Sequence, residues 1–196
     1  MHAVTRERNA RSILDLGCGD GDLLLRIVQE GGVGPVVGID VCAQSLARLS
    51  GRLRAERPDG ADAVEILHAS LLDLPSRLCG FDCAVLVETI EHLDAERLGA
   101  LERSVFGFLR PTTVVVTTPN AEFNTLLGVP AHRFRHPDHR FEWDRARFRR
   151  WAGSVAERRG YLVRCSDIAG HHPQLGGASQ MAVFDLADRA GRSQAA

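Results

Sequence analysis

Two short segments of the chain carry the residue types that bind divalent metal ions. Residues 88–92 hold two carboxylates and an imidazole, and residues 136–143 add two further imidazoles. Carboxylate oxygens and imidazole nitrogens together form sites for manganese, magnesium or zinc. On a helical turn, the i, i+3 and i+4 spacing of the first segment brings its three side chains toward one point. Carboxylates are also favoured at ordinary helix starts, so a purely structural role stays open. The predicted ligands are Glu88, Glu91, His92 and His139.

The second segment lies in a stretch that is rich in arginine and interleaved with aromatic residues. Seven arginines fall between residues 133 and 150. Such a stretch can bind phosphates and stack on bases, which favours a phosphate-bearing substrate. The alternative is a helix with a charged outer face, which is what we expect for Arg145, Arg149 and Arg150. Arg133 and Arg135 precede that helix and are the better candidates for RNA contacts.

A glycine-rich turn, Asp15-Leu-Gly17-Cys-Gly19-Asp-Gly21, follows the first apolar segment. Glycines let the backbone turn tightly and approach a ligand closely. The spacing is not the Gly-x-Gly-x-x-Gly that holds a pyrophosphate, and a mere tight connection is the alternative. Asp40 ends the next apolar segment, where its carboxylate could accept hydrogen bonds from ribose hydroxyls. Together the turn and Asp40 predict a cofactor site.

Bulk composition is that of an ordinary globular protein. The chain has 196 residues, 44% of them apolar and 25% charged, which fits one domain with an adequate core. The net charge of −1 excludes a general polycation. No apolar run approaches the roughly 20 residues of a membrane span, and the start lacks a signal peptide, so we expect a cytoplasmic protein. The five cysteines contain no Cys-x-x-Cys pair and predict reduced, mostly buried thiols.

Apolar strands alternate with helices along the chain. This rhythm predicts an α/β fold with a mainly parallel, seven-stranded sheet, helices on both faces and an antiparallel edge. Such sheets bind ligands at the carboxyl ends of their strands. One domain, 1–196, is expected, with a core of 11–186, an active-site loop at 119–143 and a tail at 187–196. The predicted strands are 12–16, 35–40, 64–67, 81–87, 113–118, 161–165 and 180–186, and the predicted helices are 22–30, 45–56, 91–109 and 144–159.

The glycine turn resembles the first motif of the class I S-adenosylmethionine-dependent methyltransferases, a superfamily with a Rossmann-like fold. The resemblance implies that Asp15, Gly17 and Gly19 hold the methionine part of S-adenosylmethionine. It also implies that Asp40 binds the ribose. Ser70 follows the third strand, where the superfamily usually contacts the adenine.

Asp138-His139-Arg-Phe-Glu142-Trp143 resembles the loop signature of the small-RNA 3′-terminal 2′-O-methyltransferases of the Hua-enhancer type. These enzymes modify plant microRNAs, animal piwi-associated RNAs and bacterial RNA ends under repair. Residues 118–124 also resemble this family, which makes Asn120 a candidate RNA contact, and 135–136 resemble its bacterial branch. The resemblance implies that Mn²⁺ or Mg²⁺, held by the four ligands named above, binds the 2′- and 3′-hydroxyls of the terminal nucleotide. His136 is a hypothetical general base or substrate contact, with a solvated loop histidine as the alternative.

The function that follows is metal-dependent methylation of the 2′-hydroxyl at RNA 3′ ends, probably best placed in bacterial RNA repair. A small-molecule O- or N-methyltransferase without a metal is one alternative. A non-catalytic RNA-binding domain that retains the cofactor fold is another, against which the intact glycine turn and Asp40 argue.

The amino-terminal end departs from the family pattern. Family members carry a segment like Pro-Pro-Leu-x-x-Gln-Arg before the first strand, and nothing in residues 1–10 matches it. Bacterial relatives also have an amino-terminal half that works with a partner kinase–ligase. We therefore expect a catalytic-domain fragment or an unusually short member, with an RNA-repair kinase–ligase as partner of the missing region.

Overall fold

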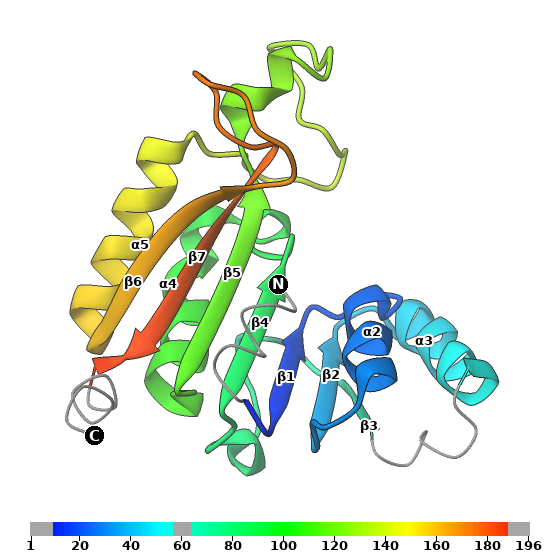
Figure 1. Ribbon diagram of the computed structural model, residues 1–196. Coiled ribbons are helices and arrows are strands. Elements are labelled where there is room, and N and C mark those ends of the chain that lie inside the picture. The colour runs from blue at the N-terminus through cyan, green and yellow to red at the C-terminus, as the bar shows by residue number, and fades with distance from the viewer. Residues whose placement is uncertain (1–9, 57–63, 188–196) are drawn as a thin grey trace. The chain divides into compact units, whose positions relative to one another are not determined.

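The computed structural model describes residues 10–56 and 64–187, whose strands form one seven-stranded sheet in the order β3-β2-β1-β4-β5-β7-β6 (Figure 1). β1 pairs in parallel with β2 and β4, and β2 pairs in parallel with β3. β6 and β7 are antiparallel. The predicted mainly parallel α/β sheet with an antiparallel edge is therefore confirmed. The strands are β1 (Ile13–Leu16), β2 (Val36–Asp40), β3 (Val64–His68), β4 (Cys83–Val87), β5 (Thr113–Pro119), β6 (Tyr161–Ile168) and β7 (Ser179–Leu186).

The chain divides into two compact units, of which the first comprises Met1–Leu86 and Arg103–Val114. Its strands are almost entirely buried: β1 and the greater part of β2 and β4 are closed to solvent. Helix α3 buries a leucine stripe at i, i+3 and i+7, as its sequence period predicts. The helical segments of this unit are α2 (Asp22–Glu30), α3 (Ala43–Glu56), η2 (Ser76–Leu78) and the π-helical η5 (Arg103–Leu109).

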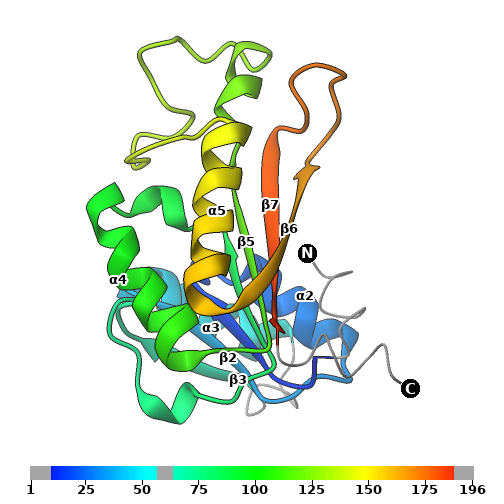
Figure 2. The same ribbon diagram turned by 90° about the vertical axis from the view of Figure 1, so that its left-hand side faces the viewer.

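The second unit comprises Val87–Glu102 and Val115–Ala196. Its long helix α5 (Arg145–Arg159) runs along β6 and β7 (Figure 2). Asp144 begins this helix by accepting a hydrogen bond from the Arg147 amide at 2.6 Å, and Gly160 ends it with a φ of 72°. Both boundaries agree with the sequence prediction. The shorter helical segments are η3 (Ile90–His92), η4 (Ala95–Arg97), α4 (Leu98–Glu102) and η6 (Ala121–Thr125).

The predicted continuous helix over 91–109 is wrong in its first half. Leu93 and Asp94 are extended, with ψ of 144° and 136°, and they separate the single turn η3 from η4. A residue in extended conformation cannot continue the helical hydrogen-bond ladder. Glu91 and His92 therefore lie in an isolated 3₁₀ turn, and the helical i, i+4 geometry does not position them.

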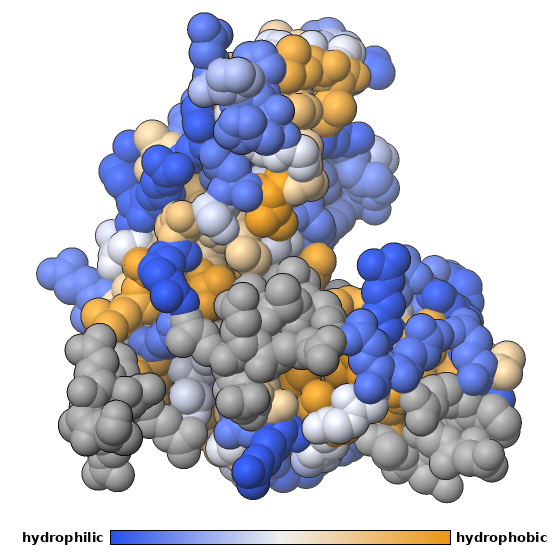
Figure 3. Space-filling model, viewed as in Figure 1, coloured by the Kyte–Doolittle hydropathy of each residue, from blue (hydrophilic) through white to orange (hydrophobic). Residues whose placement is uncertain are grey.

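Exposed positions differ in part from expectation. The thiols of Cys18 and Cys83 are buried, as predicted, but Cys42 and Cys79 are exposed and Cys165 is half-buried. Apolar side chains gather over η6 and the following loop (Figure 3), where Leu126 and Leu127 are exposed. No helix of the described ranges is both long and apolar enough to pass through a bilayer. The proposed amino-terminal departure (1–9) and nearly all of the predicted tail lie outside the described residues.

A nearly buried carboxylate joins α4 to the end of α5. Glu102 accepts hydrogen bonds from the Arg158 and Arg159 guanidinium groups, each at 2.7 Å. Burial alone would raise the pKa of Glu102, but these hydrogen bonds outweigh it and hold the pKa below its ordinary value. The folded state therefore gains stability from the ionised carboxylate above the unfolded-state pKa. That gain disappears as the pH falls through the lower, folded-state pKa.

We expect Glu102→Gln to lower the free energy of unfolding at neutral pH by about 1–3 kcal/mol, because charge-assisted hydrogen bonds are lost. The difference from the unsubstituted chain should shrink in acid, where both carry a neutral side chain. Urea unfolding followed by circular dichroism at neutral and acidic pH measures it. Glu157→Gln, an exposed carboxylate on the same helix, is the control and should change little. An equal loss at both pH values for Glu102→Gln would contradict the ion-pair explanation.

Candidate cofactor turn and metal-binding cluster

The glycine turn of the first unit has the conformation that its sequence predicts. Gly17, Gly19 and Gly21 all have positive φ, between 52° and 84°. At Gly21 a Cβ atom would lie 2.1 Å from Leu49 Cδ1, so only glycine fits there. The Gly17 amide donates to the Ile39 carbonyl at 2.7 Å, which ties the turn to the end of β2.

Two acidic side chains flank this turn. Asp40 is half-exposed and accepts hydrogen bonds from the amides of Gly19 at 2.9 Å and Cys42 at 2.8 Å. Asp15 is almost fully buried, and its Oδ2 has no hydrogen-bond partner. Burial, together with the nearby charge of Asp40, raises the pKa of Asp15 to about 7. Ser70, exposed after β3, accepts a hydrogen bond from the Leu72 amide at 3.3 Å. An unpaired buried carboxylate oxygen is costly and suits a cationic ligand group.

Three histidines from the two predicted metal segments meet in the second unit. The ligand atoms of His92, His136 and His139 all lie within 4.8 Å of one another. The ring centroids of His92 and His139 are 4.9 Å apart. In the described ranges, this is the one group of three or more potential ligand side chains that comes so close. The structure thus joins residues that are far apart in sequence, and it places His136 inside the cluster.

His139 is oriented by a carboxylate that the sequence analysis did not single out. The Glu142 carboxylate binds His139 Nδ1 at 2.6 Å and leaves Nε2 available to a ligand. Glu142 also accepts hydrogen bonds from the Asn124 side chain at 2.6 Å and the Arg135 amide at 2.7 Å. Burial would raise the pKa of Glu142, but these hydrogen bonds lower it below its ordinary value. The only advance signal was the place of Glu142 in the Asp-His-Arg-Phe-Glu-Trp motif.

His92 has a backbone partner in the same loop, since its ring makes a hydrogen bond to the Asp138 backbone. Partial withdrawal of the ring from water lowers the pKa of His92, and the neighbouring His139 and His136 add to this effect. A neutral imidazole with one nitrogen oriented by a backbone group is the form that binds metals.

Two carboxylates of the same unit have the electrostatics of an unfilled cation site, although they do not belong to the 4.8 Å histidine group. Glu91 is fully buried: its Oε2 accepts a hydrogen bond from Thr118 at 3.1 Å, and its Oε1 has no partner. Burial and then the charge of Glu88 raise the pKa of Glu91 to about 8. Burial also raises the pKa of Glu88, whose backbone has a strained φ of 50°. An orphaned buried oxygen among carboxylates and imidazoles fits a divalent cation.

The predicted RNA contacts occupy different environments. Arg133 is exposed. Arg135 is half-buried, and its guanidinium donates to the Asn124 side chain and to the carbonyls of Asn120 and Ala178. Asn120 is fully buried, so the prediction that its side chain contacts RNA has no support in this structure. Asn120 and Arg135 instead hold the loop that carries the histidines.

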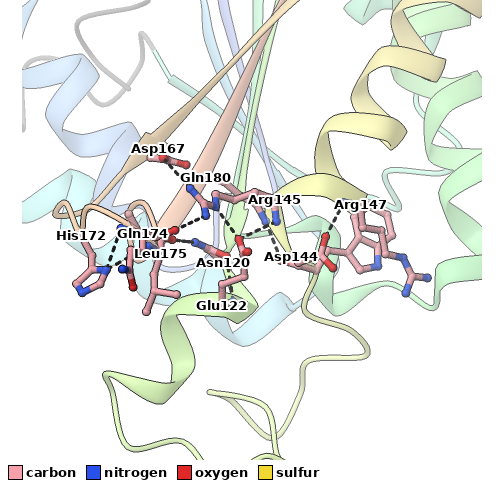
Figure 4. Close-up of polar contacts among 12 residues, drawn as sticks. Asn120, Glu122, Asp144, Arg145, Arg147, Asp167, His172, Gln174, Leu175 and Gln180 are labelled. Atoms are coloured by element: carbon pink, nitrogen blue, oxygen red, sulfur yellow. Dashed lines mark hydrogen bonds and ion pairs between the residues drawn. The ribbon is translucent and has the colours of Figure 1, made fainter.

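Both ends of that loop are tied to the segment between β6 and β7 and to β7 itself (Figure 4). Asn120 Nδ2 donates to the carbonyls of Leu175 at 2.8 Å and Gly177 at 2.9 Å. Gln180 Nε2 donates to the Trp143 carbonyl at 2.9 Å. The loop over 119–143 therefore leaves and rejoins the body of the unit at fixed points, which limits the positions that His139 can take.

Comparison with known proteins identifies the class of this architecture. Residues 13–112 match a family described as "Methyltransferase domain". The small RNA 2′-O-methyltransferase of Gallus gallus is 36% identical over 192 residues, which cover 92% of this chain and 50% of that protein. The chain spans about half the length of such curated relatives.

Solved structures agree. The methyltransferase domain of bacterial CtHen1 is 40% identical, with a TM-score of 0.84 and coverage of 94% of both chains. The small RNA methyltransferase HEN1 is 31% identical, with a TM-score of 0.86, over 94% of this chain and 24% of that one. High identity across nearly the whole of a matched domain shows common descent and not the fold alone. This chain belongs to the small RNA 2′-O-methyltransferase family of methyltransferases.

Proposed function

We propose that this chain transfers a methyl group from S-adenosylmethionine to the 2′-hydroxyl of the 3′-terminal nucleotide of RNA, in a reaction that depends on Mn²⁺ or Mg²⁺. One observation carries the metal dependence: Glu91, fully buried and with an unpaired oxygen, belongs to the same compact unit as the histidine cluster. A buried carboxylate of this kind is destabilising unless a cation binds it. Family membership supports the RNA substrate.

The first unit supplies the groups that would bind the methyl donor. The amides of the glycine turn and the unpaired Oδ2 of Asp15 suit the amino and carboxylate groups of the methionine part. Asp40, half-exposed, would accept hydrogen bonds from the ribose hydroxyls, and Ser70 is the proposed adenine contact. Each of these groups binds and orients the donor, which is most of what methyl transfer requires.

Glu88, Glu91, His92 and His139 would hold the ion. A divalent cation lowers the pKa of a hydroxyl that binds it and fixes the orientation of that hydroxyl. Two imidazoles among the ligands favour manganese over magnesium. Glu142 keeps His139 in one tautomer, and Thr118 fixes one oxygen of Glu91. Only a 3′-terminal nucleotide has free 2′- and 3′-hydroxyls side by side, so a site that needs both selects the strand end.

The setting that we propose is cytoplasmic RNA repair in bacteria, with a kinase–ligase as partner. The Arg135-His136 pair, which resembles the bacterial branch, and the likeness to the bacterial CtHen1 domain support this setting.

Methyl transfer to RNAs that differ only at the 3′ end tests the proposed function. With labelled S-adenosylmethionine and manganese, an RNA ending in a 2′,3′-diol should be labelled. The same RNA with a 3′-phosphate or a 2′-deoxy terminus should not, because it lacks the paired hydroxyls or the acceptor itself. Labelling of the blocked ends would refute selection by the diol, and a failure to label any RNA would favour a small-molecule substrate or a non-catalytic domain.

The raised pKa of Glu91 predicts proton release when manganese binds. At neutral pH the carboxyl is largely protonated, and a bound cation displaces that proton. Manganese affinity should therefore rise from about pH 6 to about pH 8 and level off above the Glu91 pKa. Isothermal titration in buffers of different ionisation enthalpy measures both affinity and protons released. Glu91→Gln should lose the release and most of the affinity, and His139→Ala should lose affinity while proton release per bound ion remains. A pH-independent affinity for the unsubstituted chain would contradict this role of Glu91.

His136 is the cluster member best suited to donate a hydrogen bond to the substrate. Its Nδ1 accepts a hydrogen bond from the Asp138 amide at 3.2 Å, which leaves the proton of the neutral ring on Nε2. This arrangement favours a donor over a general base.

We expect His136→Ala to raise the KM for RNA by about tenfold with little change in kcat, since one hydrogen bond to a charged group is lost. His136→Gln keeps an N–H donor and should recover part of the affinity. His132→Ala, an exposed histidine of the same loop, is the control. A large fall in kcat that His136→Gln does not rescue would instead assign His136 as the general base.

A further inference from the structure

The first turn of α5 carries positive charge where a helix disfavours it. Helix amino-termini attract acidic side chains, and a cation there costs about 0.3–1 kcal/mol. The first turn of α5 has no acidic residue and contains Arg145 and Arg147, with Arg150 one turn later. Burial of apolar area does not explain these arginines, because Arg147 and Arg150 are exposed. Their placement calls for an anionic partner.

The structure separates the arginines of this region into two groups. Arg145 is neutralised within the protein: it pairs with Glu122 at 2.6 Å and lies 3.7 Å from Asp167. For Arg147 and Arg150, no carboxylate of residues 10–56 or 64–187 lies at ion-pair distance. Figure 4 shows Arg145 directed toward Glu122 and Arg147 extending to the other side of the helix start. The spacing of Arg147 and Arg150 places both on one face of α5.

Arg147 is also held in place. Its guanidinium carbon lies 5.2 Å from the centroid of the Trp143 ring, and that ring is almost fully buried. A cation–π contact with a fixed ring restricts the guanidinium before any ligand binds and leaves its N–H donors free for a phosphate. An arginine that is ordered, exposed and without an acidic partner has the properties of an anion-binding residue.

A short segment links this surface to the histidine cluster. Trp143 ends the same run of chain that begins with His139, and Arg140 in between donates its amide to the Glu91 carbonyl at 2.7 Å. The run therefore contacts the predicted metal ligand at one end and Arg147 at the other. Cluster and arginines lie in one compact unit, so their separation is fixed by a few residues of ordered chain.

We propose that the face of α5 formed by Arg147 and Arg150 binds backbone phosphates of the RNA strand upstream of its 3′-terminal nucleotide. The inference rests on the proposed function, which places the terminal nucleotide at the histidine cluster. The surface contacts phosphates and no base edges, so it contributes affinity without sequence preference. It also gives longer RNAs an advantage over a dinucleotide, which cannot reach it.

The test compares Arg147→Gln/Arg150→Gln with the unsubstituted chain. The dissociation constant of a fluorescent single-stranded RNA of about twelve nucleotides, ending in a 2′,3′-diol, is measured between about 50 and 200 mM salt. We expect the double variant to bind about tenfold more weakly. Each lost phosphate contact on a single strand lowers the salt dependence by about 0.7, so the slope should fall by about 1.4.

Two controls make the result specific. Arg54→Gln/Arg164→Gln removes the same charge from exposed positions on α3 and β6 and should leave affinity and slope unchanged. With a dinucleotide substrate, the double variant and the unsubstituted chain should have the same KM. The kcat at saturating long RNA should also be unchanged, since neither arginine belongs to the metal or cofactor groups.

The outcomes separate the surface from the proposed function. Methyl transfer by the unsubstituted chain, with equal affinity and slope in the double variant, would refute the surface and leave the function intact. Equal losses in the α5 and control variants would also refute the surface, because only net charge would then matter. Weaker, less salt-dependent binding in the α5 variant alone supports the surface, and the absence of methyl transfer in the same samples would refute the function alone.

Discussion

The carboxylate of Glu91 is the constraint on which much of the second unit depends. A fully buried side chain with an unpaired oxygen is destabilising, and its pKa of about 8 expresses that cost as a bound proton. Replacement by an apolar residue would remove the cost, so the carboxylate is better explained by a ligand than by stability. The strained backbone of Glu88 adds a second local cost in the same segment. Rigid surroundings must compensate for both.

That rigidity comes from the loop between β5 and α5 and from the groups that hold it. Asn120 and Gln180 fasten its ends to the segment around β7, and Arg135 and Glu142 connect its interior. The loop therefore has the hydrogen bonding of an ordered element without its regular structure. This explains how 25 residues or so with little secondary structure can fix three imidazoles within 4.8 Å of one another. Two units contribute separately: one has the cofactor turn, and the other has this cluster.

Local signals predicted most of the fold. Strand positions followed from short apolar runs, and α5 followed from Asp144 and Gly160, because caps act through neighbouring backbone atoms. The helix expected over 91–109 failed at Leu93 and Asp94, whose extended backbone has no clear marker in the sequence. In the site, the histidines could be named in advance because their chemistry is specific. Glu142 could not, because its role is to hold His139, and Asn120 was assigned to RNA when it is buried.

The arginines show why clusters of charge are difficult to interpret from sequence. Arg135 was expected to bind RNA, but its partners are an amide side chain and carbonyls, two of them more than ten residues away in sequence. Arg145 is matched by Glu122 and Asp167, which come from η6 and β6. Whether an arginine is available depends on such distant partners, and composition does not contain that information. The charge that remains exposed on α5 is therefore a property of the folded unit, and it lies at a helix end where a phosphate stabilises the helix as well as the complex.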